Sequence, residues 1–255
     1  MSSEYLADYI ENAAFASQRM LYPLENGELD NVGIQELCSF FRQHALCSYY
    51  LYHDSSILFS DLMKSAAAYI YFLENTSSNQ IILSRAKPFY DAICGGYFDA
   101  AEKISKLSPF IWHKDKEYED DFLFIKFIMQ LFFSDAVKED LDLTLDALNG
   151  ELTDENLFRG DICRSLIDKN GELFRDSLDI LVQTRKAKIE KMIEDEAIAE
   201  EYWSWMRYFS SEATALVKLA EKMGLELDSV IEDVPSILRE DSGVSFREDS
   251  WKIKI

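Results

Sequence analysis

Apolar residues recur along this chain three and four positions apart, which is the spacing of one buried face on an α-helix. Leu6 and Ile10 belong to the first such helix, which is expected to begin at Ser2 or Ser3. The stretch 22–33 holds a proline and two glycines and is predicted to be a loop. Further helices are predicted over about 34–49, 57–74, 156–168, 173–193 and 200–223.

Residues 86–107 have the pattern of two short helices in a hairpin. Pro88 suits the first turn of one helix, and Gly95 with Gly96 supplies its stop. The small and apolar residues that lead to Ile104 give the second helix a packing face. This pattern is typical of tetratricopeptide-type units, but no sustained repeat accompanies it, so a full solenoid is not predicted.

The stretch from Phe122 to Phe133 is apolar on nearly every side and is interrupted only by Lys126 and Gln130. A helix of this kind belongs at the centre of a packed bundle. It is too short to span a bilayer, and a membrane partner is not expected.

These patterns predict an all-α fold, a multi-helix bundle of packed αα-hairpins that is partly tetratricopeptide-like. The sparse use of turn residues, 9 Gly and 4 Pro in 255 residues, agrees with long helices and short connections. We expect a single helical domain over 1–255, with sub-lobes 1–113 and 114–255 as the alternative division. The tail 244–255 alternates weakly and predicts either a small β-element or an extended arm.

Charge is distributed very unevenly along the chain. Acidic residues outnumber basic residues 47 to 26, for a formal net charge of −21. Residues 1–113 carry 13 acidic and 7 basic residues, whereas 114–255 carry 34 and 19. Self-repulsion of this size costs stability, so we expect a basic partner. Nucleic acid is not an expected partner, because phosphate contacts require positive surface.

The acidic excess is densest over 135–161, where nine acidic residues face only Lys138 and Arg159. A solvated helix face is the ordinary explanation of such a run. Here, however, the acids are not balanced by interspersed lysines, and they follow an apolar helix that would hold them rigidly. Fixed acidic patches favour fast capture of a basic protein. The expected partner-binding residues are Asp120, Asp121, Asp140, Asp142, Asp146, Glu151, Asp154 and Glu155.

No catalytic motif is present: the chain has no nucleophile elbow, phosphate-binding loop, dinucleotide-binding loop or zinc-protease helix. His44 and Cys47 are three positions apart but lack the paired ligand spacing of a zinc site. The acids of 117–121 could bind a divalent cation, although the first turn of a helix stabilises negative charge equally well. We therefore expect no catalysis, no metal and no cofactor.

Cysteine usage and the N-terminus indicate the compartment. The four cysteines show no CxxC spacing and are expected to be reduced, mostly buried thiols. The first residues lack the basic and apolar regions of a secretory signal. A cytoplasmic protein is therefore predicted.

Several short segments resemble the helical immunity proteins of bacterial polymorphic toxin systems, in particular the family called immunity protein forty-nine. The last third also looks similar to immunity proteins that protect against secreted DNase toxins. The resemblance covers about 86–238. It is carried by Ala92–Ala101 (AICGGYFDAA), Leu107–Pro109 (LSP), Glu117–Phe122 (EYEDDF), Ser210–Ala220 (SSEATALVKLA), the Gly224 turn and Val234-Pro235.

The resemblance implies a non-enzymatic inhibitor that binds a co-produced toxin, and many such toxins are nucleases with basic clefts. It transfers no contact residue, because toxin contacts differ between members, so the residues above come from charge placement alone. Two other hypotheses remain open. One is a helical adaptor or scaffold that holds a peptide in a groove around 86–107, and the other is a carboxylate-dependent metal enzyme.

Overall fold

The described chain consists of α-helices and short 3-10 turns, which confirms the all-α prediction. A computed structural model describes residues 5–199 and 205–255, so the expected helix start at Ser2 or Ser3 lies outside the described residues. No strand occurs within these two ranges. The helices are α1 Leu6–Glu25, α2 Asn31–Tyr52, α3 Ser55–Asn75, α4 Lys87–Cys94, α5 Phe98–Leu107, α6 Glu119–Phe133, α7 Lys138–Glu151, α8 Phe158–Asp168, α9 Gly171–Glu194 and α11 Ser211–Lys222, with 3-10 turns η2 Ser78–Gln80, η3 Leu83–Arg85, η4 Ser236–Arg239 and η5 Ser250–Lys252.

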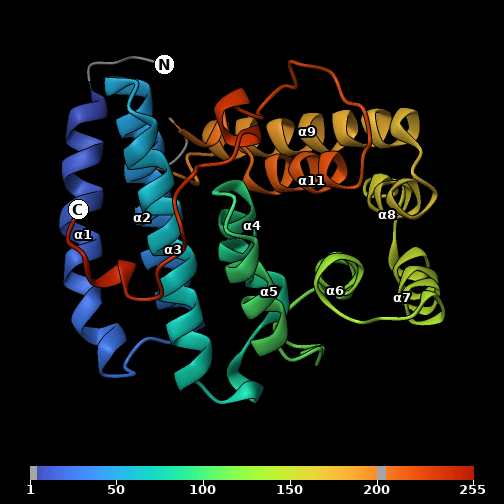
Figure 1. The fold of residues 1–255 in the computed structure, drawn as a ribbon, viewed down its shortest axis with the longest axis horizontal. Coiled ribbons are helices and arrows are strands. Elements are labelled where there is room, and N and C mark those ends of the chain that lie inside the picture. The colour runs from blue at the N-terminus through green and yellow to red at the C-terminus, as the bar shows by residue number, and fades with distance from the viewer. Residues whose placement is uncertain (1–4, 200–204) are drawn as a thin grey trace.

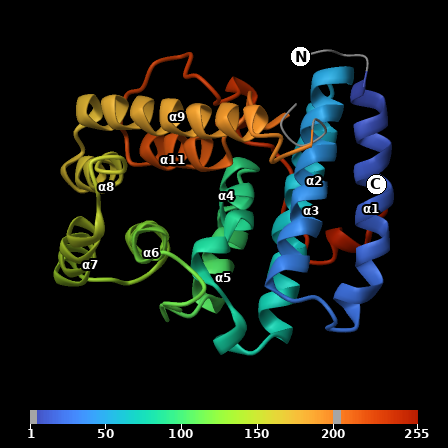
Figure 2. The same cartoon turned by 180° about the vertical axis from the view of Figure 1, so that it is seen from behind.

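The helices form two groups joined by the α4–α5 hairpin. Figure 1 shows α1, α2 and α3 side by side at one end, and α9 with α11 as a pair that lies crosswise to them in the other half of the molecule. Figure 2 shows α7 and α8 at the opposite end, with α6 between α5 and α7. Because α4 packs against both α3 and α11, one apolar core continues from Leu6 to Trp251. The division into sub-lobes stays a prediction.

The loop predicted over 22–33 is shorter than expected at both ends. The first helix continues through Pro23 to Glu25. The second helix begins at Asn31, because the Asp30 carboxylate accepts hydrogen bonds from two backbone N–H groups of its first turn. A side-chain oxygen at this position satisfies donors that have no partner inside the helix, and this stabilises an early start.

The helix predicted over 200–223 is wrong where it crosses Ser210. That residue has extended backbone, and its hydroxyl accepts the N–H of Ala213 at 3.1 Å, so α11 starts at Ser211. The N–H of Ser210 donates instead to the carbonyl of Asp233, at 3.0 Å. Residues 200–204 of the predicted helix lie outside the described ranges.

The central position of α6 and the hairpin at α4–α5 are both confirmed. Phe127, Ile128 and Met129 of α6 have no exposed surface. The hairpin turns at Gly96, whose φ of +79° favours glycine over residues with a Cβ. Within the described ranges, no helix has the length and apolar character needed to cross a membrane.

A buried ion pair ties the interior of the first group to the hairpin. Arg42 on α2 donates from Nε to the Asp91 carboxylate on α4, at 2.7 and 2.9 Å. Ser65 on α3 donates its hydroxyl to the same carboxylate at 2.5 Å. Asp91 is fully buried, so its charge depends on these partners, and the three helices are held at fixed positions.

The C-terminal segment is an extended arm, one of the two forms predicted for it. Beyond η4 it returns to the first group, where the Ile255 carbonyl accepts the amide of Gln18 at 3.0 Å. Trp251 is 2% exposed, and its ring centroid lies 4.8 Å from that of Tyr71. Buried aromatic contact of this kind anchors the arm.

We predict that Trp251→Ala lowers the free energy of unfolding by about 3–5 kcal/mol, because it leaves a cavity under the arm. Urea denaturation followed by circular dichroism measures the change. Ile253→Ala is the matched control, since Ile253 is 46% exposed two positions farther along the same arm. Its expected loss is below about 1 kcal/mol. Equal losses in the two variants would show that Trp251 does not anchor the arm.

Candidate functional site

Six of the eight predicted partner-binding residues lie on α7 and in the loop after it. We call this set the acidic face. Five of its members are exposed and Asp142 is half-buried. Figure 1 places α7 at the edge of the molecule. Among the described residues, none of the six forms an ion pair. The acidic face consists of Asp140, Asp142, Asp146, Glu151, Asp154 and Glu155.

The acidic face is fixed to the helical body by the packing and hydrogen bonds of α7 and its loop. Leu145 and Leu148 of α7 have no exposed surface, and α7 packs against α6 and α8. Thr144 donates its hydroxyl to the side-chain oxygen of Gln130 on α6, at 2.8 Å. In the loop, the Asn156 side chain accepts the N–H of Thr153 at 2.6 Å. The carboxylates therefore project from a rigid support.

An apolar side chain lies among these acids. Leu143 is 69% exposed. It is three residues from both Asp140 and Asp146, so all three share the outward side of α7. Exposed apolar groups inside a polar surrounding are a common feature of protein interfaces.

Asp120 and Asp121 are placed differently from the other six. Both lie in the first turn of α6, as expected for acids at a helix N-terminus. Each accepts from Arg159 of α8, with N–O distances of 2.7 Å. Asp120 also accepts the side-chain amide of Asn156 at 2.7 Å, which links it to the loop of the acidic face. One guanidinium thus offsets part of the charge of the two carboxylates.

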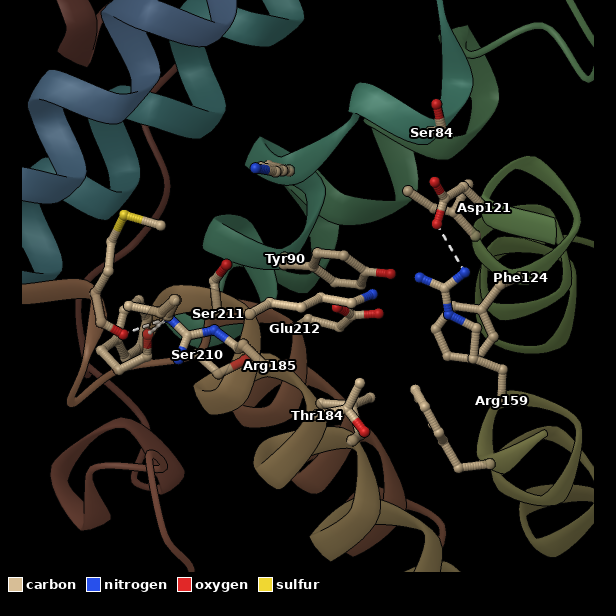
Figure 3. A pocket seen from close by; sticks show the side chains of 18 of the residues that line it. Ser84, Tyr90, Asp121, Phe124, Arg159, Thr184, Arg185, Ser210, Ser211 and Glu212 are labelled. Carbon is tan, nitrogen blue, oxygen red and sulfur yellow. Dashed lines mark hydrogen bonds and ion pairs between the residues drawn. The ribbon is translucent and has the colours of Figure 1, made fainter. Parts of the chain in front are cut away.

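A cavity of about 380 Å³ opens between α4, α6, α8, α9 and the start of α11. Five basic side chains and only two acidic ones line it, in contrast to the net charge of the protein. Figure 3 shows Tyr90, Arg159 and Glu212 converging on it from three elements. We call it the basic pocket; its charged lining residues are Arg42, Lys87, Arg159, Arg185, Lys188, Asp121 and Glu212.

Burial sets the protonation behaviour of the basic pocket. Desolvation raises the pKa of the Glu212 carboxyl, and the positive charge of Arg159 opposes that rise. Lys87 has exposed surface, but desolvation by the surrounding protein lowers its pKa. Arg185 is held by Asp233 at 3.1 Å and by the carbonyl of Phe209 at 2.6 Å.

The basic pocket was missed in the sequence because its residues are spread from position 42 to position 212. Two local signals could have pointed to it. Arg42 is the sole arginine or lysine of its predicted helix and directly follows two phenylalanines, and Arg159 is an isolated base inside the acidic run. A buried arginine needs an acceptor, so each implies a polar group on another element.

Local geometry is relevant to the two remaining hypotheses, the peptide-binding adaptor and the carboxylate-dependent metal enzyme. Residues Pro88–Cys94 of α4 are all buried, and the adaptor hypothesis stays a prediction. Glu117 accepts the backbone N–H groups of Ser84 and His113, at 2.9 and 3.1 Å. Within the described ranges, no three side chains of the metal-binding types converge.

Comparison of the chain with protein-family models, with curated proteins and with solved structures finds no match. The resemblance to immunity proteins therefore rests on the short segments quoted above. The acidic face and the basic pocket are the features of the described residues that bear on function.

We predict that Arg159→Met lowers the free energy of unfolding by about 3 kcal/mol, because Asp120 and Asp121 lose the one positive charge that is paired with them. Urea denaturation measures the loss. Arg175→Met is the matched control, since Arg175 is 42% exposed and its contact with Asp228 is 3.7 Å long. Its expected loss is below about 1 kcal/mol. A loss at Arg159 no larger than that of the control would contradict the assigned role.

Proposed function

We propose that this protein is an immunity-type inhibitor that binds a basic toxin, of the nuclease type, through its acidic face and without catalysis. The observation that carries the proposal is the set of six carboxylates, unpaired among the described residues and held on a packed helix and the loop after it. In ordinary surface helices, interspersed lysines neutralise such charge. Here Lys138 is the sole basic residue of α7.

Placement as well as quantity of charge supports the proposal. At physiological salt, charges interact over about 8 Å, so a partner responds to a local cluster more than to the net charge. Complementary clusters can raise association rates to about 10⁸–10⁹ M⁻¹s⁻¹. A rigid support keeps the ordering cost of binding low, because the acidic face need not rearrange.

Inhibition follows from the chemistry of the proposed partner. A nuclease holds the nucleic-acid backbone with basic side chains. Carboxylates on α7 and its loop would bind those basic side chains in place of the phosphates. Leu143 would supply apolar contact at the centre of the interface. We place this activity in the cytoplasm, in keeping with four buried, unpaired cysteines.

Charge reversal at Asp140, Asp146, Asp154 and Glu155 to Lys is predicted to abolish capture of the partner, because these residues supply the attraction. The tagged protein is used to capture partners from the producing cell, and bound proteins are identified by mass spectrometry. The wild type should recover a basic protein in stoichiometric amount. That protein should be toxic when expressed alone and harmless when co-expressed with the wild type.

The control reverses four exposed acids on α1, α2 and the loop between them: Asp8, Glu11, Glu28 and Glu36. Both variants have the same net charge, so only the placement of charge differs between them. The control should capture the partner and protect cells as the wild type does. If the two variants behave alike, the acidic face is not the binding surface. If the wild type captures no basic toxic protein, the proposed function fails.

Leu143→Ala is predicted to weaken binding to the captured partner about tenfold or more, mainly through faster dissociation. Surface plasmon resonance with the purified partner measures both rates. Ile180→Ala on α9 is the control, since Ile180 is also half-exposed (52%) but lies outside the acidic face. An unchanged dissociation rate in Leu143→Ala would remove Leu143 from the interface.

A further inference from the structure

The basic pocket has the dimensions of a small-molecule site. Its volume of about 380 Å³ lies within the range of about 300–1,000 Å³ that is typical of ligand pockets. Lys87 and Lys188 on its wall are exposed, so solvent reaches the cavity. Tyr90, Phe124 and Trp205 supply aromatic surface to the lining. Aromatic walls with a few convergent polar groups favour a ligand that contains a planar ring.

Hydrogen-bond donors without acceptors gather around this cavity. Within the described chain, Arg42 Nη2, Arg159 Nε and Trp205 Nε1 are buried and have no hydrogen-bond partner. Arg42 is only 5% exposed, although it lines the cavity. Arginine and tryptophan side chains donate hydrogen bonds and accept none. These side chains therefore add donors and positive charge to the lining of the cavity, which favours an anionic ligand there.

Two further kinds of donor line the same cavity. The ammonium groups of Lys87 and Lys188 form no ion pair among the described residues. Ser211 and Glu212 begin the twelve-residue helix α11, and in the described chain their backbone N–H groups have no acceptor. A helix N-terminus carries partial positive charge and binds anions through such groups.

The acidic residues near the cavity do not cancel the positive charge of its lining. Asp121 is paired with Arg159 at 2.7 Å. Of the acidic lining residues described, Glu212 is thus the one without an ion pair. It is outnumbered by Lys87 and Lys188. Burial raises the pKa of Glu212, which favours its neutral form beside an incoming anion.

We propose that the basic pocket binds a small organic anion with a planar ring, of the size and charge of a nucleoside monophosphate. The anionic group lies near Lys87, Lys188 and the start of α11, and the ring lies against the aromatic wall. The ligand is distinct from the protein partner of the acidic face. The inference therefore stands or falls independently of the inhibitor function.

Isothermal titration calorimetry on the full chain tests the inference with four probes. Adenosine 5′-monophosphate and indole-3-acetate carry a ring with a phosphate and with a carboxylate, respectively. Adenosine carries a ring without charge, and inorganic phosphate carries charge without a ring. At least one ring-bearing anion should bind with a dissociation constant below about 100 μM, and whichever binds more tightly identifies the anionic group. Adenosine and phosphate should each bind at least tenfold more weakly. The inference is overturned if neither ring-bearing anion binds, or if adenosine binds equally well.

Variants locate the site for the tighter of the two anions. Lys87→Gln and Lys188→Gln should each weaken binding at least fivefold, whereas Glu212→Gln should tighten it, because it removes the competing negative charge. Lys254→Gln is the control, since Lys254 is exposed on the C-terminal arm and outside the pocket. It should leave the affinity unchanged. An equal loss in the control and the pocket lysine variants, or weaker binding in Glu212→Gln, would contradict the assignment.

Discussion

The inward placement of basic side chains is the constraint on which the rest of this structure depends. Arg42 reaches Asp91 in the interior, and Arg159 joins the start of α6 to α8. Lys218 of α11 donates to the carbonyls of Cys94 and Glu240, at 3.4 and 2.9 Å. A buried cation needs such partners, because its desolvation is otherwise too costly. The scarce positive charge of the chain is thereby used to connect helices.

Two opposite electrostatic features stand beside this arrangement. Because Lys138 is the sole basic residue of α7, the carboxylates of α7 and its loop remain without counter-charges on the surface. Where α4, α8, α9 and α11 meet, basic side chains line a cavity. The proposed protein partner matches the first feature, and the proposed small anion matches the second.

The sequence predicted the helices well where one face is continuously apolar, as in α3 and α6. It failed where a side chain overrides that pattern: Asp30 starts α2 early, and Ser210 divides the last predicted helix. The acidic face was predictable, because its residues are close together in the sequence. The pairing of Asp120 with Arg159 was not, because it joins residues 39 positions apart, and such contacts are determined by tertiary packing.

Amide hydrogen exchange of the complex with the captured toxin tests the central claim most directly, since it maps the bound surface without any substitution. The account predicts slower exchange in α7 and the following loop, over 138–157, with α1 and α2 unchanged. Slower exchange confined to α1 and α2, with none in 138–157, would contradict it.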